Sequence, residues 1–556
     1  MVFVVVAEHP EDRTLVVLQE CGPDGRPGAR SEVAREGLAA AVAEREAARP
    51  RWAWDDTSRW YPDLLGAGVR VERCHDLRLS HVVLRRSSMC AGSDLARAPQ
   101  GPWDQPRPEA AAPTADSLFD DVAQATSGTA DLERSLTELV AQLAAMASAP
   151  EPGRLRLLLA AESTGALIAE EMRHDGMPWS VTRHDELLTQ ALGERPRGSA
   201  RPLHLEALAA QVRDALDRPG LNLDSQVDLL RAMRSAGCDV TSTRTAEIRR
   251  LEHPVVEPLL EYKKLARLLS ANGWVWMETW VHDGRFRPDY VPGGVVTGRW
   301  ATSGGGALQL PAAIRAAVRA DPGWCLVVAD AAQLEPRVLA AMSGDAAMAA
   351  AGRQADLYQG VVDAAIVETR QQAKYAMLGA IYGATTGAGA VLMPRLTQAY
   401  PRAVGLVEAA ARAGERGEVV TTWLGRSSPT PGESWQAQKQ AATAEGAEAD
   451  DVREARRRAR DWGRFTRNFV VQGTAAEWAL CWMAALRRRL RTVEGRPHLV
   501  FFLHDEVMVH SPVEVAQEVA TAVRDAAEEA GRLLFGDSPV DFALTVSVVE
   551  SYDQAK

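Results

Sequence analysis

Three carboxylates in this sequence adjoin strongly apolar runs, an arrangement that suits a metal site. Asp330 ends the apolar stretch WCLVVAD and precedes the helix-like LEPRVLAAM, while Asp505 and Glu506 separate the apolar runs HLVFFL and VMVHSP. An acid at the C-terminal tip of a buried strand can hold a metal ion over a cleft. Both positions also have a simpler interpretation, because Asp often caps a helix or occupies a hairpin turn.

A second group of residues recurs at every fourth position, and its members are Arg370, Lys374, Leu378 and Tyr382. Four residues of a helix return to the same face with a drift of about 40°, so all four side chains share one face. Two cations beside an apolar side chain and a tyrosine could bind a triphosphate with a base stacked behind it. A solvated helix would explain Arg370 equally well. Lys374 favours the binding interpretation, because arginine supplies most of the 63 basic residues and lysine is rare.

Two weaker patterns suit contacts with nucleic acid. Arg464, Asn468 and Gln472 repeat the four-residue spacing and form a stripe that could follow the backbone and minor groove of a duplex. The Gly- and Ser-rich loop VTGRWATSGGGALQLP holds Arg299 and Gln309 and could lie close to a nucleic-acid backbone. Polar stripes usually face water, so neither pattern identifies a site by itself.

The elements that must position these residues predict a mixed α/β (α+β) fold. Strand-like runs (VFVVVA, TLVVLQ) and helical stretches such as SEVAREGLAAAVAEREAA alternate over the first 85 or so residues. Residues from about 131 to 290 are mainly helical; strands and helices then mix, ending in a helix over 513–535 and the strand FALTVSVVE. Residues 427–462 predict a surface insertion with partial helix.

Composition is typical of a soluble globular protein, with 46% hydrophobic and 25% charged residues. No apolar run approaches the roughly 20 residues that span a bilayer, and the first residues indicate a strand rather than a signal peptide, so we expect no membrane partner. Six scattered cysteines fit a reducing cytoplasm. A net charge of −11 argues against indiscriminate coating of nucleic acid but not against a locally basic cleft.

In this order, the segments resemble the signature motifs of family A DNA polymerases, which bacterial DNA polymerase I typifies. DAAQLEPR resembles D-Y-S-Q-I-E-L-R, RQQAKYAMLGAIYG resembles the fingers helix R-x-x-x-K-x-x-x-F-G-x-x-Y-G, and LHDEV resembles V-H-D-E. RNFVVQGTAAE and TGRW...LQLP resemble N-x-P-x-Q-G-T-A-A-D and T-G-R-L...L-Q-N-I-P. The resemblance covers roughly residues 155–556. It implies a right-hand palm, fingers and thumb fold that joins deoxynucleotides to a primer with two Mg²⁺ ions, or Mn²⁺ as a substitute.

The resemblance also implies a role for each motif residue. Asp330 and Asp505 would hold the two ions, Glu506 would support them, and Lys374 would protonate the leaving group. Glu335 would fill the space of a ribonucleotide 2′-hydroxyl. The full nucleotide-binding set would be Arg370, Lys374, Leu378, Tyr382, Gln333, Glu335 and Tyr358. The residues that would contact primer–template DNA are Arg299, Gln309, Arg464, Asn468, Gln472 and His504.

Several positions depart from the family pattern. Ala331 and Ala332 replace a Tyr and a Ser, Leu378 replaces the fingers-helix aromatic, and Leu310 replaces an Asn. Tyr358 stands where a phosphate-contacting His is usual. None of these changes removes a metal ligand, so we expect activity to survive with altered kinetics, sugar discrimination or fidelity.

The resemblance further predicts the domain layout. Residues 1–95 would form a degenerate, RNase H-like 3′–5′ exonuclease-type domain, 96–130 a Pro/Ala-rich linker and 131–556 the polymerase, divided into thumb (about 155–255), palm (about 256–345 and 473–556) and fingers (about 346–472). The first domain lacks the family's D-x-E, and Ser80 stands where an Asp is required. The acids nearby are Glu8, Asp12 and Asp76. We expect no 5′-nuclease domain before it.

These observations favour a monomeric, cytoplasmic, nucleoid-associated DNA polymerase that fills gaps in repair or replication without proofreading. A bifunctional polymerase with 3′–5′ exonuclease activity is one alternative, and shortening of a primer without nucleotides would identify it. A non-catalytic DNA-binding scaffold is the other, and it would bind a primer–template without extending it.

Overall fold

The computed structural model describes residues 2–105, 131–198, 200–383, 387–444 and 448–555. Helices and strands are mixed throughout, which confirms the predicted fold class. The chain forms two compact units. Unit 1 comprises Met1–His174, Tyr290–Thr302 and Val327–Ser547, and unit 2 comprises Asp175–Asp289, Ser303–Leu326 and Val548–Lys556. Most of the predicted linker lies outside the described residues, and the predicted palm, fingers and thumb boundaries stay predictions.

Unit 1 begins with a five-stranded sheet of order β3-β2-β1-β4-β5. Its strands are β1 (Phe3–Glu8), β2 (Leu15–Cys21), β3 (Pro27–Ala34), β4 (Arg51–Trp54) and β5 (Cys74–Asp76). The pairs β1–β2 and β2–β3 are antiparallel, whereas β1–β4 and β4–β5 are parallel. The expected strands VFVVVA and TLVVLQ are therefore confirmed.

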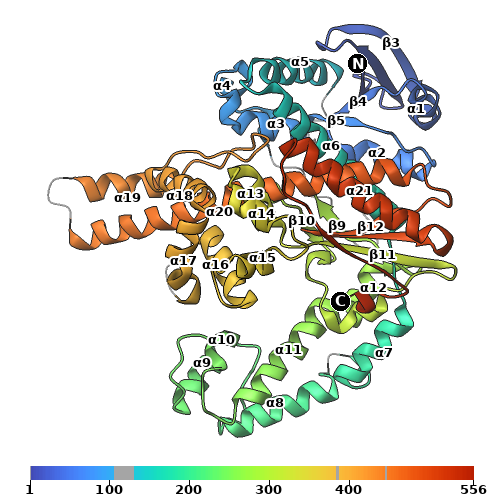
Figure 1. Cartoon of the computed structure of the whole chain (residues 1–556). Coiled ribbons are helices and arrows are strands. Elements are labelled where there is room, and N and C mark those ends of the chain that lie inside the picture. The colour runs from blue at the N-terminus through green and yellow to red at the C-terminus, as the bar shows by residue number, and fades with distance from the viewer. Residues whose placement is uncertain (1, 106–130, 199, 384–386, 445–447, 556) are drawn as a thin grey trace. The chain divides into compact units, whose positions relative to one another are not determined.

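Helices cover both faces of this sheet, drawn in blue in Figure 1. They are α1 (Leu38–Glu46), α2 (Thr57–Gly66), α3 (Leu77–Arg86), α4 (Asp94–Arg97), α5 (Leu132–Ser148) and α6 (Pro152–Asp175). Val4 and Val6 pack into a cluster with α1 and α2, while Phe3 and Val5 pack into another with α3 and α5. Successive strand residues point to opposite faces and both faces are covered, so β1 is apolar at every position from Phe3 to Ala7.

The first predicted helix is shorter than expected. Its residues 31–34 belong to β3, where they pair with β2, and α1 begins only at Leu38. The strand is an exposed edge, so its polar side chains meet water while the backbone gains ladder hydrogen bonds. Pairing with a neighbouring strand therefore overrides the local helix propensity of Ser, Glu and Ala.

A second sheet, of order β12-β13-β11-β14, carries the acidic motifs. Its strands are β11 (Trp324–Ala331), β12 (His498–Leu503), β13 (Glu506–Pro512) and β14 (Leu544–Val549). The strands β12 and β13 form a hairpin, and Leu503 pairs with Glu506 across its turn. The helices α20 (Ala449–Leu490) and α21 (Ala516–Phe535) pack against each other and against this hairpin (Figure 1). The predicted last helix and last strand are confirmed.

The region between the two acidic motifs is helical and builds its own core. Its helices are α13 (Leu334–Ser343), α14 (Ala346–Ala351), α15 (Leu357–Asp363), α16 (Arg370–Tyr382), α17 (Gly387–Ala399), α18 (Pro401–Arg416) and α19 (Glu433–Thr443). Residues from α13 to α18 share one buried apolar cluster with Val471 of α20. The predicted insertion 427–462 contains α19 and the first turns of α20.

The 42-residue helix α20 is long and apolar enough to cross a membrane by length and composition. However, 89% of the qualifying window is buried inside the protein. Burial by other protein segments is typical of a core helix, which fits its packing against α18 and α21.

Unit 2 is mainly helical, as expected for the region before residue 290. Its longer helices are α7 (Val181–Leu192), α8 (Leu203–Ala215), α9 (Gln226–Ser235), α11 (Val256–Asn272) and α12 (Trp274–Trp280). A small sheet of order β6-β8-β7 joins β6 (Met177–Pro178), β7 (Val281–His282) and β8 (Arg285–Phe286). Trp179, Trp276 and Phe286 form an aromatic cluster in this unit, with ring centroids 4.9–5.5 Å apart.

Candidate active site

Two carboxylates from separate motifs meet at one edge of the second sheet. Asp330 is the penultimate residue of β11, and Asp505 lies in the β12–β13 turn. The backbone N–H of Ala331 donates to the carbonyl oxygen of Asp505 at 2.8 Å, which joins the end of β11 to this turn. Gln333, not Asp330, occupies the N-cap position of the helix that follows, and no side chain caps that helix, so the capping interpretation of Asp330 does not hold.

The electrostatics of this pair suit a bound cation. Burial, followed by the charge of Asp330, raises the pKa of Asp505 to about 6, and Glu506 adds to the effect. Like charges in a partly buried site repel, and a divalent cation relieves that repulsion.

The hairpin turn and its two buried strands fix the position of Asp505. His504 has a left-handed φ of 58°, which a two-residue hairpin turn requires. The strands on either side are almost entirely buried, and the side chain of Glu506 is 1% exposed. Asp505 thus occupies a hairpin turn and also faces Asp330, so both interpretations of this position hold together. His504 lies at the same turn and is exposed.

The donor groups at this sheet edge suit some metals better than others. Among the described residues, no group of three or more His, Cys, Asp or Glu side chains forms a closed metal site. Zinc would need such a closed cage, whereas magnesium takes one or two carboxylates and completes its shell with water and substrate phosphates. Asp330 and Asp505 therefore fit magnesium, and Glu506 is placed to support them.

Glu335 connects three chain segments beside the carboxylate pair. The guanidinium of Arg299 forms an ion pair with Glu335, and the Tyr382 hydroxyl donates to Glu335 Oε2 at 2.5 Å. Burial, together with Glu335, raises the pKa of Tyr382 to about 12, and Gln472 lies within hydrogen-bonding reach of the same hydroxyl. Arg299 also acts electrostatically on Asp505. The structure thus brings together site residues predicted from five separate motifs.

Helix α16 presents the predicted positive face. Arg370, Lys374 and Tyr382 lie on its open side and Leu378 is half-buried, while the opposite face of the helix is buried. The Lys374 side chain forms no hydrogen bond or ion pair with any other described residue. Its ammonium group is therefore available to an anion.

Arg370 has a protein partner that the sequence did not reveal. Its Nε donates to Asp356 Oδ2 at 2.5 Å, and its guanidinium lies over the Tyr358 ring, 5.6 Å from the centroid. Asp356 is the N-cap of α15, so the signal in the sequence was an Asp directly before the helix LYQGVVD. Two predicted nucleotide-binding residues, Arg370 and Tyr358, therefore lie side by side.

Arg337 is a second residue that sequence reasoning missed. Its side chain is fully buried and donates to the carbonyl oxygens of Ala332, Gly352 and Asp541, each within 2.7 Å, and to two more in the segment before α15. Gln333, which has a left-handed φ of 50°, accepts from the backbone N–H of Leu357 at 3.2 Å. These contacts fix the chain that follows Asp330. The predicted contact of Gln333 with a nucleotide stays a prediction.

The predicted nucleic-acid contacts are spread over both units. In α20, Arg464 is exposed and pairs with Asp461, while Asn468 and Gln472 are half-buried. The Asn468 Oδ1 atom is buried and has no hydrogen-bond partner in the described part of the chain. Gln309 belongs to unit 2, where it accepts from Arg267 at 3.2 Å.

Comparison with known proteins decides the family. A family model described as DNA polymerase family A matches residues 205–553. This chain belongs to DNA polymerase family A. The resemblance inferred from the motifs is thereby confirmed, and members of this family generally use divalent metal ions.

Relatives in the family include a thermostable DNA polymerase I of Thermus thermophilus, which is 28% identical over 347 residues, covering 57% of this chain and 39% of the relative. DNA polymerase I of Chloroflexus aurantiacus is 26% identical over 60% of this chain and 36% of the relative. The matches thus span well under half of these relatives' length. A solved structure, the POL domain of Pol1 from M. smegmatis in complex with DNA primer-template and dNTP, has the same fold, with a TM-score of 0.65, 16% identity and coverage of 100% of this chain and 96% of that one.

The acids of the N-terminal region are each engaged by protein groups. Glu8 pairs with Arg35 at 2.6 Å and with Arg59 at 2.5 Å. Asp76 is buried and accepts from the Thr57 hydroxyl and from backbone amides, while Asp12 is exposed and bonded to its neighbour Thr14. Burial, followed by Asp56, raises the pKa of Asp76 to about 7. This pattern is typical of structural acids.

Proposed function

We propose that this chain is a DNA-directed DNA polymerase that adds deoxynucleotides to a primer 3′-hydroxyl on a template, with two Mg²⁺ ions as cofactors. The observation that carries the proposal is the Asp330–Asp505 pair, set beside Glu335, Tyr382 and the cationic face of α16 in a family A chain. Primer–template DNA and dNTPs are the proposed substrates. We propose a monomer without a membrane partner that works in the cytoplasm, on the nucleoid, in repair or replication gap filling.

Each residue of the site would have its own role in phosphoryl transfer. Asp330 and Asp505 would hold the metal ions, whose charge would activate the primer hydroxyl and stabilise the triphosphate. Arg370 and Lys374 bind the triphosphate through charge-assisted hydrogen bonds. The primer 3′-hydroxyl loses its proton to solvent water as its oxygen bonds to the α-phosphorus and the bond to pyrophosphate breaks, and Lys374 Nζ donates a proton to the leaving group.

Arg370 must exchange its partner during this reaction. In the structure it is paired with Asp356 on an exposed surface. A triphosphate carries more charge than one carboxylate, so it would displace Asp356 from the guanidinium at small cost. Arg299 and Tyr382 hold Glu335, and we propose that its side chain excludes a ribose 2′-hydroxyl.

The absence of proofreading is a further part of the proposal. Arg35 and Arg59 neutralise Glu8, and internal donors satisfy the buried Asp76. A nuclease needs carboxylates that are free to hold metal ions, and these two are already occupied by cationic or hydrogen-bonding groups. Ser80, at the position where the family pattern has an Asp, is buried.

Primer extension tests the polymerase proposal. We expect the wild type to extend a labelled primer with Mg²⁺, and Asp505→Asn to lose about three orders of magnitude or more in rate, because a metal ligand supplies several kcal/mol of transition-state stabilisation. Asp283→Asn is a matched control, because Asp283 also lies in a hairpin turn, between β7 and β8, outside the site. A wild type that binds the primer–template but never extends it would support the scaffold alternative.

Primer shortening tests the absence of proofreading. With Mg²⁺ and no nucleotides, we expect the wild type and Glu8→Ala to leave a mismatched primer equally intact on denaturing gels. Metal-dependent shortening by the wild type that Glu8→Ala abolishes would establish the bifunctional alternative instead.

A further inference from the structure

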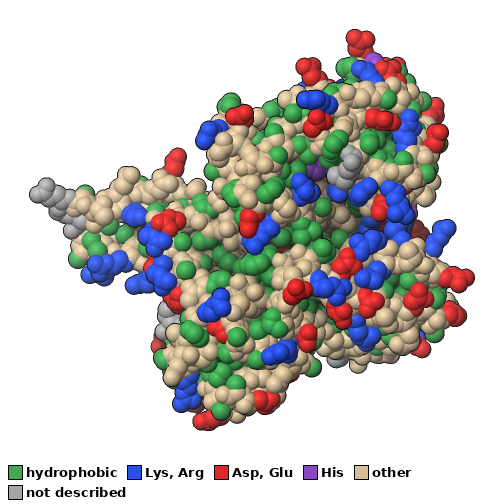
Figure 2. Space-filling view, turned by 45° about the horizontal axis from the view of Figure 1, so that its top comes forward, with side chains coloured by type: hydrophobic (Ala, Val, Ile, Leu, Met, Phe, Trp, Pro, Cys, Tyr) green, Lys and Arg blue, Asp and Glu red, His purple; other side chains and the backbone are tan. Residues whose placement is uncertain are grey.

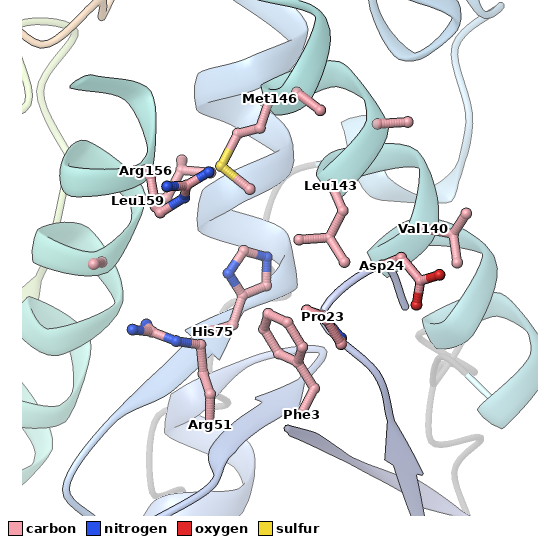
Figure 3. A pocket seen from close by; sticks show the side chains of 13 residues that line it. Phe3, Pro23, Asp24, Arg51, His75, Val140, Leu143, Met146, Arg156 and Leu159 are labelled. Carbon is pink, nitrogen blue, oxygen red and sulfur yellow. The ribbon is translucent and has the colours of Figure 1, made fainter. Parts of the chain in front are cut away.

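A cavity of about 560 Å³ lies in the N-terminal part of unit 1, and none of its lining residues belongs to the site described above. The strands β1, β4 and β5 contribute Phe3, Arg51 and His75 to it. The helices α5 and α6, with Pro23 and Asp24 of the β2–β3 loop, form the remaining walls (Figure 3). Its volume is within the roughly 300–1,000 Å³ that ligand pockets occupy.

The lining is apolar on one side and cationic on the other. Figure 3 shows Leu143 and Val140 of α5 on one side of the cavity, with the rings of Phe3 and His75 at its centre. The guanidinium groups of Arg51 and Arg156 lie on the opposite side. A ligand with an apolar body and a polar head would match this division.

Arg51 is the most informative residue of the cavity. It is half-buried, and Nη1 donates to the Cys74 carbonyl oxygen at 3.0 Å. Its Nε atom is buried without a hydrogen-bond partner, and no carboxylate pairs with Arg51 within the described ranges. A guanidinium withdrawn from water without a counter-ion is costly, so an anion at this position would stabilise it.

Arg156 is placed to act together with Arg51. It lies on α6, is exposed, and forms no ion pair with a described residue. Two guanidinium groups at one side of an apolar cavity are complementary to a carboxylate or phosphate group.

The other ionisable groups do not compete for this role. Gln142 donates its amide to Leu77 O at 2.7 Å and to Glu138 at 2.6 Å, so its oxygen must accept from His75 Nε2, 2.7 Å away. Burial lowers the pKa of His75 to about 4, and the ring is neutral. Asp24, on the apolar side in Figure 3, is exposed and pairs with Arg26 at 3.1 Å.

We propose that this cavity binds a small amphiphilic anion, with its carboxylate or phosphate group at Arg51 and Arg156 and its apolar body against α5 and α6. The proposal stands independently of the polymerase activity. An unfilled packing space would have the same apolar walls. It would not account for Arg51, whose buried Nε atom has no hydrogen-bond partner, on the same side as a second guanidinium, that of Arg156, without a carboxylate partner among the described residues.

Calorimetric titration of the full chain with one set of eight-carbon ligands tests the proposal. Octanoate and octyl phosphate carry the two anionic heads, and octanol and octylammonium carry neutral and cationic heads on the same body. We expect saturable 1:1 binding of at least one anion and binding weaker by roughly tenfold to a hundredfold for the other two heads. The stronger of the two anions identifies the head group. Equal binding of octanol and the anions, or no saturable binding of either anion, would overturn the proposal.

Variants locate the binding in this cavity. We expect Arg156→Gln and Arg51→Met to weaken the anion by roughly tenfold or more, and Arg51→Lys to restore part of the affinity. Arg134→Gln is the matched control, because Arg134 is exposed on α5 and does not line the cavity. Ala144→Phe fills the cavity from a helix position that lines it and should abolish binding without unfolding the chain. Unchanged affinity in Arg156→Gln and Ala144→Phe would place the anion elsewhere and refute the assignment.

Discussion

Burial raises the pKa values of two carboxylic acids, Asp505 and Glu477. Their surroundings differ, and the difference distinguishes an acid that can bind a cation from an acid with a structural role. Asp505 lies beside Asp330 at the sheet edge, and its pKa is about 6. Glu477 of α20 is 1% exposed, its pKa is about 7, and it accepts from Leu424 N at 2.9 Å and from the Thr422 hydroxyl. Asp505 is thus open to a cation, whereas internal donors already satisfy Glu477.

The raised pKa of Glu477 predicts a pH-dependent stability. The folded chain holds this proton more tightly than the unfolded chain, so stability falls as pH rises from the ordinary value of 4.5 to about 7. Glu477→Gln removes this loss. We expect the variant to unfold with a free energy up to about 3 kcal/mol higher above pH 7 and to match the wild type near pH 4. Urea unfolding across this pH range measures the difference.

Glu454→Gln is the control for this experiment. Glu454 lies on the exposed part of the same helix and pairs with Arg457 and Arg458. Its variant should show no gain in stability above pH 7. A similar gain in both variants would attribute the effect to the charge of α20 as a whole.

At the scale of elements, α20 connects the N-terminal region to the sheet that carries the acidic motifs. Near its C-terminal end, buried Arg487 donates to both oxygens of Glu171 in α6, at 2.8 and 2.7 Å. It also donates to the carbonyl oxygens of Val71 and Glu72, while Tyr61 donates to Glu171 at 2.5 Å. Burial acts to raise the pKa of Glu171, but Arg487 more than offsets it and the pKa is lowered.

Loss of Arg487 should therefore destabilise the whole of unit 1. We expect Arg487→Met to lower the free energy of unfolding by roughly 3–5 kcal/mol, because it leaves Glu171 buried and unpaired. The double variant Arg487→Met, Glu171→Met should recover part of that loss. Urea denaturation of the wild type, Arg487→Met, Glu171→Met and the double variant measures the coupling free energy between the two side chains.

The neighbouring Arg488 provides a matched control. It is exposed and pairs with Glu529 at 2.5 Å. Arg488→Met should change stability by less than about 1 kcal/mol, because exposed ion pairs contribute little. Equal losses for both variants would contradict a special role for the buried contact.

At the scale of the whole molecule, the proposed function requires an acidic chain to bind an acidic polymer. The net charge is −11, and Figure 2 shows Lys, Arg, Asp and Glu side chains mixed over the visible face. Affinity for DNA must then come from local cations that contact phosphates, and each such contact releases counterions.

The salt dependence of primer–template binding tests this account. We expect Arg464→Gln to weaken binding equally on different template sequences and to reduce the slope of log K against log salt by about 1. Arg458→Gln is the control, because Arg458 lies six positions earlier on another face of α20. Fluorescence anisotropy at several salt concentrations measures both slopes. An unchanged slope for Arg464→Gln would remove this residue from the DNA contacts.

The sequence by itself determined the features that depend on local order. The apolar runs around Asp330 and Asp505 are the strands β11, β12 and β13, and the four-residue spacing from Arg370 to Tyr382 is one face of α16. The periodicity of residue types and the order of the motifs are properties of the sequence alone. The helix face, the turn position and the family could therefore be inferred without coordinates.

Only the tertiary structure decided which side chains meet. The sequence suggested separate roles for Arg299, Glu335 and Tyr382, and packing joins them through Glu335. The same is true of Arg370 with Asp356 and of the β3 edge that shortens the first helix. An Arg without a carboxylate, such as Arg51, looks like any other Arg in the sequence. These features depend on contacts between segments far apart in the chain, which no local period or propensity encodes.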